Sequence, residues 1–153
     1  MTAEAGRGAA RTASDSRHRA REVALQMLYQ WEVGRAPVAE LSETLFTGTP
    51  GANALSDNHR AFALSLARGV VASVEQVDPL IRTAAEHWRL ERMNVIDRLI
   101  LRLAVYEFEH EVETPAKVII NEALELARTF SGEDAVGFIN GVLDAIRRER
   151  ERL

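Results

Sequence analysis

The hydrophobic pattern of this chain has the period of an α-helix along most of its length. The first clear stripe begins after Arg17, where apolar side chains recur at intervals of three and four residues: Ala20, Val23, Ala24, Met27, Leu28 and Trp31. Gly34 and Pro37 end this helix. The residues before it are small, polar and without periodicity, so we expect a disordered basic tail over residues 1–16.

The next segment predicts three further helices in the N-terminal half. Residues 37–46 form a short helix with Pro37 in its first turn, and turn-forming residues over 47–56 indicate a loop. Ser56 or Asp57 can cap a third helix, which has its apolar positions at Phe62, Leu66 and Val70. The pair Asp78-Pro79 is typical of a cap followed by a first-turn proline, so it predicts a fourth helix that runs toward Trp88.

Three more helices are expected in the C-terminal half. Residues 93–108 are apolar on most sides, which is typical of a helix in the middle of a bundle. Thr114-Pro115 begins a sixth helix that ends near Arg128. Residues 131–134 begin a seventh, whose core stripe is Val136, Ile139, Val142, Leu143 and Ile146. The charged residues 147–153 are expected to fray.

No stretch alternates between polar and apolar residues as a strand does, so the predicted class is all-α with about seven helices. We expect a single helical domain over residues 17–150. A seam near Leu90 divides it into two packed subdomains, over about 17–89 and 90–150.

The charge of the chain is unevenly distributed. Residues 1–21 contain five arginines and two acidic residues, a net charge of +3, whereas the rest contains 14 basic and 21 acidic residues, a net charge of −7. A basic head on an acidic body suggests a polyanion as one partner and a basic molecule as another.

Composition also excludes several classes of site. The chain has no cysteine, so disulfides, thiolate metal sites and a cysteine nucleophile are absent. Its four histidines have no metal-ligand spacing, and the glycines at 132 and 137 lack the Lys-Ser/Thr of a P-loop. We therefore expect no enzyme activity, metal or cofactor. No apolar run is long enough to cross a membrane, and we expect a cytoplasmic protein.

The first predicted helix carries an aromatic residue on its polar side. On a helical wheel Tyr29 lies opposite the core stripe with Leu25 beside it, His18 and Glu22 share that side, and Arg21 flanks it. Arginines neutralise phosphates and an aromatic ring stacks on an unpaired base, so this face predicts contact with single-stranded RNA. Alternatively, Tyr29 packs against another helix and the arginines only make the helix start soluble.

The last predicted helix has two glycines on its outer side. Gly137 and Gly141 each cost about 1 kcal/mol relative to alanine in a helix interior, and they would let another backbone approach closely. That backbone could be RNA, a partner helix or the first helix of the same chain. Phe138 and Asn140 lie at the two edges of the core stripe, where Phe138 could also be an ordinary core residue.

Three segments resemble one known family. They are SRHRAREVALQMLYQW (residues 16–31), NVIDRLILRLAVYE (94–107) and PAKVIINEALELARTFSGEDAVGFINGVLD (115–144). Together they resemble the NusB family of bacterial transcription antitermination factors, over about residues 16–147. The resemblance implies a NusB-like fold of seven helices in two packed subdomains.

The same resemblance implies a function and a set of partners. The chain would bind the single-stranded boxA element of nascent ribosomal RNA together with NusE, a ribosomal protein. This complex would join RNA polymerase and other Nus factors and promote processive transcription of rRNA. The family contains both monomers and homodimers, so a homodimer is a further expected state.

Site residues follow from the resemblance position by position. The arginine-rich motif of the family falls on Arg17, Arg19 and Arg21, and His18 stands where an arginine is common. The first-helix aromatic falls on Tyr29. The RNA contacts of the last helix fall on Asp134, Phe138 and Asn140, and the acidic edge that meets NusE falls on Glu91 and Asp97. The competing hypothesis is a helical scaffold that binds only proteins and has no specific RNA recognition.

Overall fold

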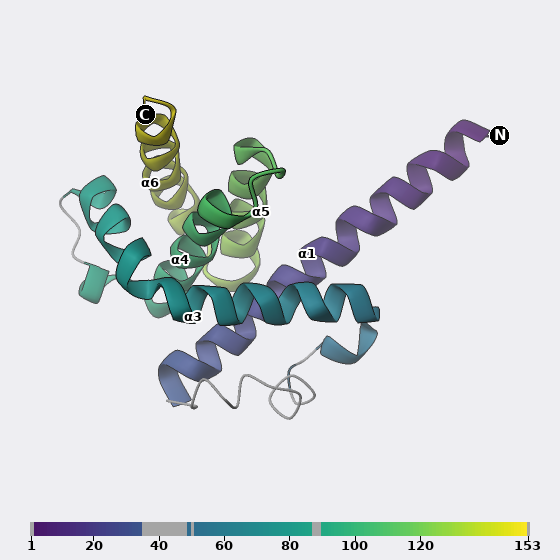
Figure 1. Ribbon diagram of the computed structural model, residues 1–153, viewed down its shortest axis with the longest axis horizontal. Helices are drawn as coiled ribbons and strands as arrows, with labels where there is room; N and C mark the ends of the chain where they lie inside the picture. Colours follow the sequence, from purple (N-terminus) through teal and green to yellow (C-terminus); the bar gives the residue numbers. More distant parts are fainter. Residues whose placement is uncertain (1, 35–48, 50, 87–89, 153) are drawn as a thin grey trace. The chain divides into compact units, whose positions relative to one another are not determined.

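The computed structural model describes the backbone of residues 2–34, 49, 51–86 and 90–152. This part of the chain contains helices and no strand, which confirms the all-α class (Figure 1). The elements, in order, are α1 (Thr2–Gly34), the 3-10 turn η2 (Ala52–Ala54), α3 (Asp57–Ala85), the 3-10 turn η3 (Leu90–Arg92), α4 (Val95–His110), α5 (Ala116–Phe130) and α6 (Glu133–Glu151).

The expected number of about seven helices is wrong, because the described residues form five α-helices. The main cause is the pair Asp78-Pro79, which the sequence suggested as the start of a new helix. In the structure α3 continues through Pro79. The proline removes one backbone hydrogen bond from the helix interior, and the Asp78 carboxylate binds Arg102 instead of capping a helix. The helix predicted over 37–46 lies outside the described residues.

Helix α1 begins at Thr2, well before the start at Arg17 that the periodicity indicated. Residues 1–16 were expected to be a disordered tail. Hydrophobic periodicity reports which residues pack against a core, whereas this segment has five alanines among its sixteen residues, and alanine favours helix without any packing. A helix made by propensity alone therefore leaves no trace in the hydrophobic pattern.

The chain divides into two compact units, residues 1–67 and 68–153, so the division lies within α3 and not near Leu90. Because the helix is continuous there, no turn residue marks the division in the sequence. In the first unit the buried apolar side chains come from α1, η2 and the start of α3, among them Val23, Leu28, Ala52 and Leu66. Trp31, the last residue of the predicted stripe, is partly exposed.

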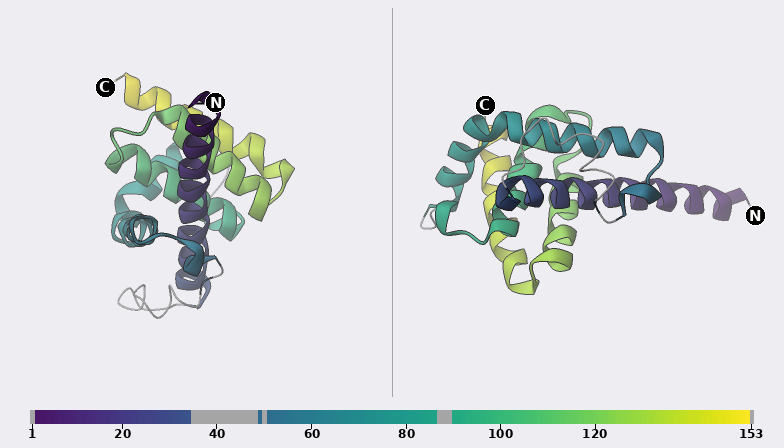
Figure 2. Two further views of the ribbon diagram at one scale, coloured as in Figure 1. Left: turned by 90° about the vertical axis from the view of Figure 1, so that its right-hand side faces the viewer. Right: turned by 90° about the horizontal axis from the view of Figure 1, so that it is seen from below.

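In the second unit, α4 packs against both α5 and α6 (Figures 1 and 2). Its residues 99–105 are all buried, so the expectation of a central helix that is apolar on most sides is confirmed. The Asn94 side chain caps α4 by accepting a hydrogen bond from the Ile96 N–H at 2.8 Å. Between α5 and α6, Gly132 has φ 151°, a backbone conformation that favours glycine over other residues.

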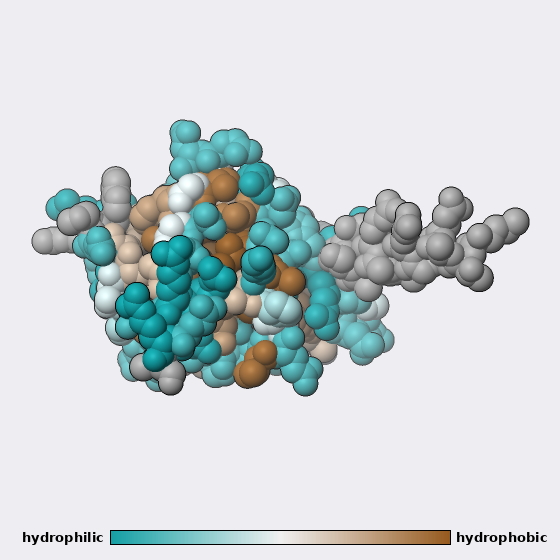
Figure 3. All heavy atoms as spheres, turned by 90° about the horizontal axis from the view of Figure 1, so that it is seen from above, coloured by the Kyte–Doolittle hydropathy of each residue, from teal (hydrophilic) through white to brown (hydrophobic). Residues whose placement is uncertain are grey.

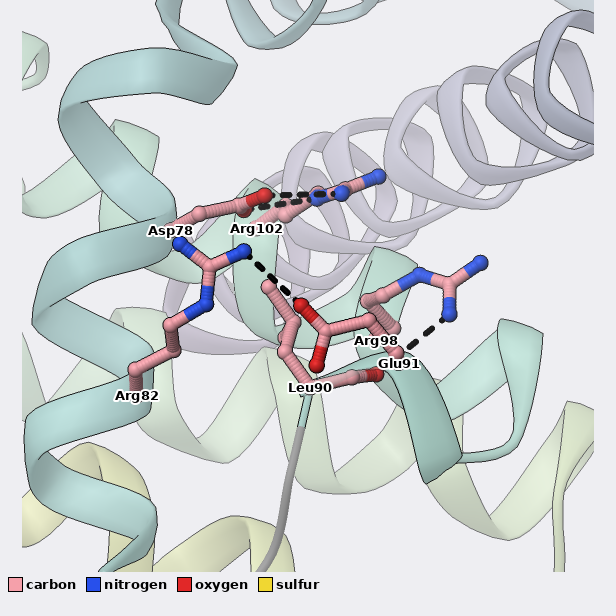
Figure 4. A network of polar contacts seen from close by, with 6 residues as sticks. All are labelled: Asp78, Arg82, Leu90, Glu91, Arg98 and Arg102. Atoms are coloured by element: carbon pink, nitrogen blue, oxygen red, sulfur yellow. Dashed lines mark hydrogen bonds and ion pairs between the residues drawn. The ribbon is translucent and has the colours of Figure 1, made fainter.

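A buried ion pair joins α3 to α4. The guanidinium of Arg102 binds the carboxylate of Asp78 through two parallel hydrogen bonds of 2.8 and 2.9 Å, and both side chains are less than a tenth exposed. Around it, Arg82 donates to Glu91 at 3.0 Å and Arg98 donates to the Leu90 carbonyl at 3.4 Å (Figure 4). These contacts tie η3 to both helices and so fix the start of α4.

Helices α3 and α4 also approach closely at Gly69. A Cβ atom added at Gly69 would overlap the ring of Tyr106, which in turn stacks on His110 with ring centroids 4.4 Å apart. Burial, followed by the charges of Glu111 and Glu107, raises the pKa of the Tyr106 hydroxyl from its ordinary value, so this group stays neutral at physiological pH.

We expect Gly69→Ala to lower the free energy of unfolding by about 1–3 kcal/mol, since the added methyl group overpacks the contact with Tyr106. Urea unfolding measures the loss. In a Tyr106→Ala background the same substitution should be neutral or stabilising, because the clash is gone and alanine favours the helix. Equal losses in both backgrounds would contradict the proposed clash.

Candidate nucleic-acid interface

The arginines of α1 are not equivalent in the structure. Arg17 and Arg19 are exposed, whereas Arg21 is only 2% exposed. The guanidinium carbons of Arg17 and Arg21 lie 5.7 and 5.4 Å from the centre of the Phe62 ring, within the range of a cation–π interaction. Arg21 is therefore committed to the fold, and the expectation that it flanks an exposed face is wrong.

The neighbouring polar face of α1 is also narrower than the helical wheel indicates. Tyr29 is 42% exposed, as its position on the wheel predicts, but Leu25 beside it is only 1% exposed and belongs to the core. His18 is half-buried, and its Nε2 lies 2.9 Å from Glu22 Oε1 one turn along the helix. The exposed cations described on this part of α1 are thus Arg17 and Arg19, which at about 100° per residue point to different sides of the helix, with Tyr29 about three turns further on.

In the second unit, a hollow of about 460 Å³ brings together residues from two predicted sites. Its lining includes Asp134 and Phe138 from α6, which were expected at an RNA contact, and Asp97 from α4, which was expected at a protein contact. Phe138 is partly exposed and is therefore not a fully buried core residue. Asp97 Oδ1 is buried and accepts no hydrogen bond from a described residue, so this carboxylate has spare acceptor capacity.

Glu91, the other residue of the expected protein contact, does not line that hollow. It lies in η3, exposed, and accepts a hydrogen bond from Arg82. An ion pair between two exposed side chains contributes little stability, so this one could open at small cost when a basic partner approaches.

Asn140 lies on the other side of α6, in a second hollow of about 350 Å³ between α5 and α6. The residues that line it are Lys117, Ile120, Asn121, Asn140, Asp144 and Arg147. Gly137 and Gly141 are exposed between the two hollows, and a Cβ atom on either would meet nothing within 4 Å. Neither glycine is thus required by packing inside the second unit.

Comparison with known proteins identifies the family of this chain. Residues 18–148 match the model of the NusB family. The chain belongs to the NusB family. Among its relatives, the transcription antitermination protein NusB of Solibacter usitatus is 48% identical over 138 residues, which is 88% of this chain and 90% of that protein. The protein of the same name from Koribacter versatilis is 43% identical over 134 residues, with the same coverage.

Solved structures of NusB proteins have the same fold. T. maritima NusB is 31% identical and superposes with a TM-score of 0.73, covering 90% of this chain and 97% of that one. A chain of the complex of antitermination factors NusB and NusE with double-stranded RNA is 25% identical, with a TM-score of 0.75. That match covers 88% of this chain and 98% of the other.

For this NusB-family chain, two features could not be inferred from the sequence. One is the packing of Arg17 and Arg21 on the Phe62 ring, and the other is the hollow between α5 and α6. In the sequence, Phe62 is only one of the apolar positions expected in the core. Lys117 and Asn121 lie on α5, whereas Arg147 lies on α6, and only packing brings these residues of two helices together. The one available signal was Lys117, which is the single lysine among 19 basic residues.

No group of three or more histidine or acidic side chains in the described residues could hold a metal ion. In the same part of the chain, no helix is both long and apolar enough to cross a lipid bilayer.

Proposed function

We propose that this chain is a transcription antitermination factor that acts in the cytoplasm and not as an enzyme. It binds the boxA element of nascent rRNA together with NusE and joins RNA polymerase and other Nus factors to keep transcription processive. The observation that carries this proposal is the match to the NusB family over residues 18–148. The fold likeness to NusB in a complex with NusE and RNA supports it.

The RNA surface in this proposal has two parts. On α1, the exposed Arg17 and Arg19 neutralise phosphates, His18 contributes a polar contact, and Tyr29 stacks on a base. Arg21 acts indirectly: its guanidinium lies over the Phe62 ring beside that of Arg17, and this packing holds Arg17 in place on α1.

On α6, Phe138 offers a ring at the first hollow, Asp134 accepts hydrogen bonds from base or sugar groups, and Asn140 contributes an amide on the far side. The carboxylates of Glu91 and Asp97 form the acidic edge for NusE. The unused acceptor capacity of Asp97 suits a basic partner, since a ribosomal protein brings many cationic donors.

The experiment that tests this proposal measures binding of the protein with NusE to a boxA RNA and to a scrambled RNA of the same composition, across a salt series. We expect tighter binding to boxA and a steep loss of affinity with salt. If the two RNAs bind equally, the antitermination function is wrong. If NusE binds and neither RNA does, the chain is a helical scaffold that recognises only protein.

A sharper version uses the two exposed arginines of α1. Replacing both Arg17 and Arg19 with glutamine should reduce the slope of log Kd against log salt concentration by about 1.4, because each lost phosphate contact on a single strand contributes about 0.7. The matched control replaces Arg128 and Arg152, which are exposed and pair with Glu125 and Glu149 on α5 and α6. An equal reduction in the control would show a nonspecific charge effect.

A further inference from the structure

The hollow between α5 and α6 differs in charge from the other hollows of the second unit. Its lining carries Lys117 and Arg147 against Asp144, a formal charge of +1. Three other hollows described in residues 68–152 are lined with net negative charge. Their charged lining residues are Arg92, Asp97 and Asp134; Glu86, Glu109, Glu149 and Arg150; and Glu109 alone, with His110 neutral. On the face drawn in Figure 3, hydrophilic side chains surround patches of apolar surface.

Of the two cations that line this hollow, Arg147 is held in place by Asp144. Asp144 accepts hydrogen bonds from Arg147 at 2.7 Å and pairs with Arg148 at 3.0 Å, so one carboxylate holds two guanidinium groups. The Nε of Arg147 is buried and has no hydrogen-bond partner among the described residues. The guanidinium is therefore fixed in place while one of its donors remains unused.

Lys117 is positioned without any partner in the described part of the chain. It is exposed in the first turn of α5, where a positive charge is opposed by the helix dipole. No ion pair or side-chain hydrogen bond of the described residues involves the side chain of Lys117, Asn121 or Asn140. Four side chains thus supply amine, amide and guanidinium donors to one small space, which is the donor set that a phosphate group requires.

The surface between the two hollows allows a chain to cross α6. At about 100° per residue, Gly137 and Gly141 lie between Phe138 and Asn140 on the exposed side of the helix. Since neither glycine has a side chain and nothing covers them within the second unit, a backbone can lie directly on α6 there. An RNA strand with one base at Phe138 can therefore continue over the glycines into the second hollow.

We propose that Lys117, Asn121, Asn140 and Arg147 bind a backbone phosphate of the RNA on the side of α6 opposite Phe138. This inference rests on the proposed function, and it extends the RNA path beyond the residues that the family resemblance supplies. Lys117 neutralises the phosphate as a point charge, Arg147 donates from its fixed guanidinium, and the two amides donate to the remaining oxygens. A basic protein partner is disfavoured here, because residues 22–153 carry an excess of acidic side chains and the positively charged hollow would repel such a partner.

The first test uses Lys117 as a chemical probe, since it is the only lysine of the chain. The full-length protein with NusE is treated with an amine-acetylating reagent, with and without saturating boxA RNA, and acetylation of Lys117 is followed by mass spectrometry. We expect RNA to slow this reaction severalfold while acetylation of the N-terminal amine serves as the internal reference. An unchanged rate at Lys117 with RNA bound would overturn the inference.

The second test measures RNA binding of Lys117→Gln across a salt series. We expect weaker binding and a slope of log Kd against log salt reduced by about 0.7, with both largely restored in Lys117→Arg. Arg128→Gln, a charge loss on the same helix outside the hollow, is the matched control. A wild-type slope in Lys117→Gln would overturn the inference and leave the proposed function standing, whereas equal binding of boxA and scrambled RNA by the wild type would remove both.

Discussion

Replacing Asp78 with alanine is expected to lower the free energy of unfolding by about 3–5 kcal/mol, the largest loss that we expect from a single substitution. Asp78 and Arg102 are both nearly buried, and their two parallel hydrogen bonds join α3 to α4. Without the carboxylate, the positive charge of Arg102 stays in the protein interior and loses the two charge-assisted hydrogen bonds that offset its desolvation. Urea denaturation followed by circular dichroism measures the change.

Two comparisons make this result specific to the buried pair. Glu125→Ala removes an exposed partner of Arg128 and should cost less than about 1 kcal/mol. Replacing both Asp78 and Arg102 with leucine and methionine should recover much of the stability, because neither charge of this pair is then left buried without the other. If Asp78→Ala lost no more stability than Glu125→Ala, the pair would contribute no more than a surface ion pair does.

The same aspartate shows where inference from the sequence reaches its limit. The Asp78-Pro79 pattern is a sound local signal for a helix start, and the prediction was wrong because a tertiary contact decided the outcome. The Asp78 carboxylate binds the buried guanidinium of Arg102, 24 residues away, and α3 continues through Pro79. The buried faces of α4 and α6 were predicted well because packing and hydrophobic periodicity agree there, although α6 continues to Glu151, into the charged residues that were expected to fray.

The candidate site shows a similar division. A helical wheel placed Tyr29 outside correctly, but it also placed Arg21 and Leu25 near the exposed face, and both are buried. A wheel describes one helix alone and cannot show that a neighbouring helix covers part of its polar side, as Phe62 of α3 does beneath Arg21. The hollow around Lys117 was unpredictable for the same reason, since its donors come from two helices.

The glycines of α6 lead to the second large effect, in which stability and binding should change in opposite directions. Replacing both Gly137 and Gly141 with alanine is expected to raise the free energy of unfolding by about 2 kcal/mol, roughly 1 kcal/mol at each position. Both are in the helix interior with ordinary helical conformation, and the added methyl groups meet nothing within 4 Å. Urea denaturation of the free protein measures this gain.

The same double substitution should weaken binding of boxA RNA by the complex with NusE about tenfold, which corresponds to roughly 1.4 kcal/mol. The methyl groups would stand on the surface that the strand is proposed to cross, and they would hold its backbone away from Phe138 and Asn140. Ala145→Gly is the matched control: it is exposed on the same helix outside both of those hollows, so it should lower stability by about 1 kcal/mol and leave RNA affinity unchanged. A double variant that is more stable and keeps wild-type RNA affinity would show that no RNA backbone lies on this face. The stability that the two glycines cost the helix would then bring no gain in RNA binding.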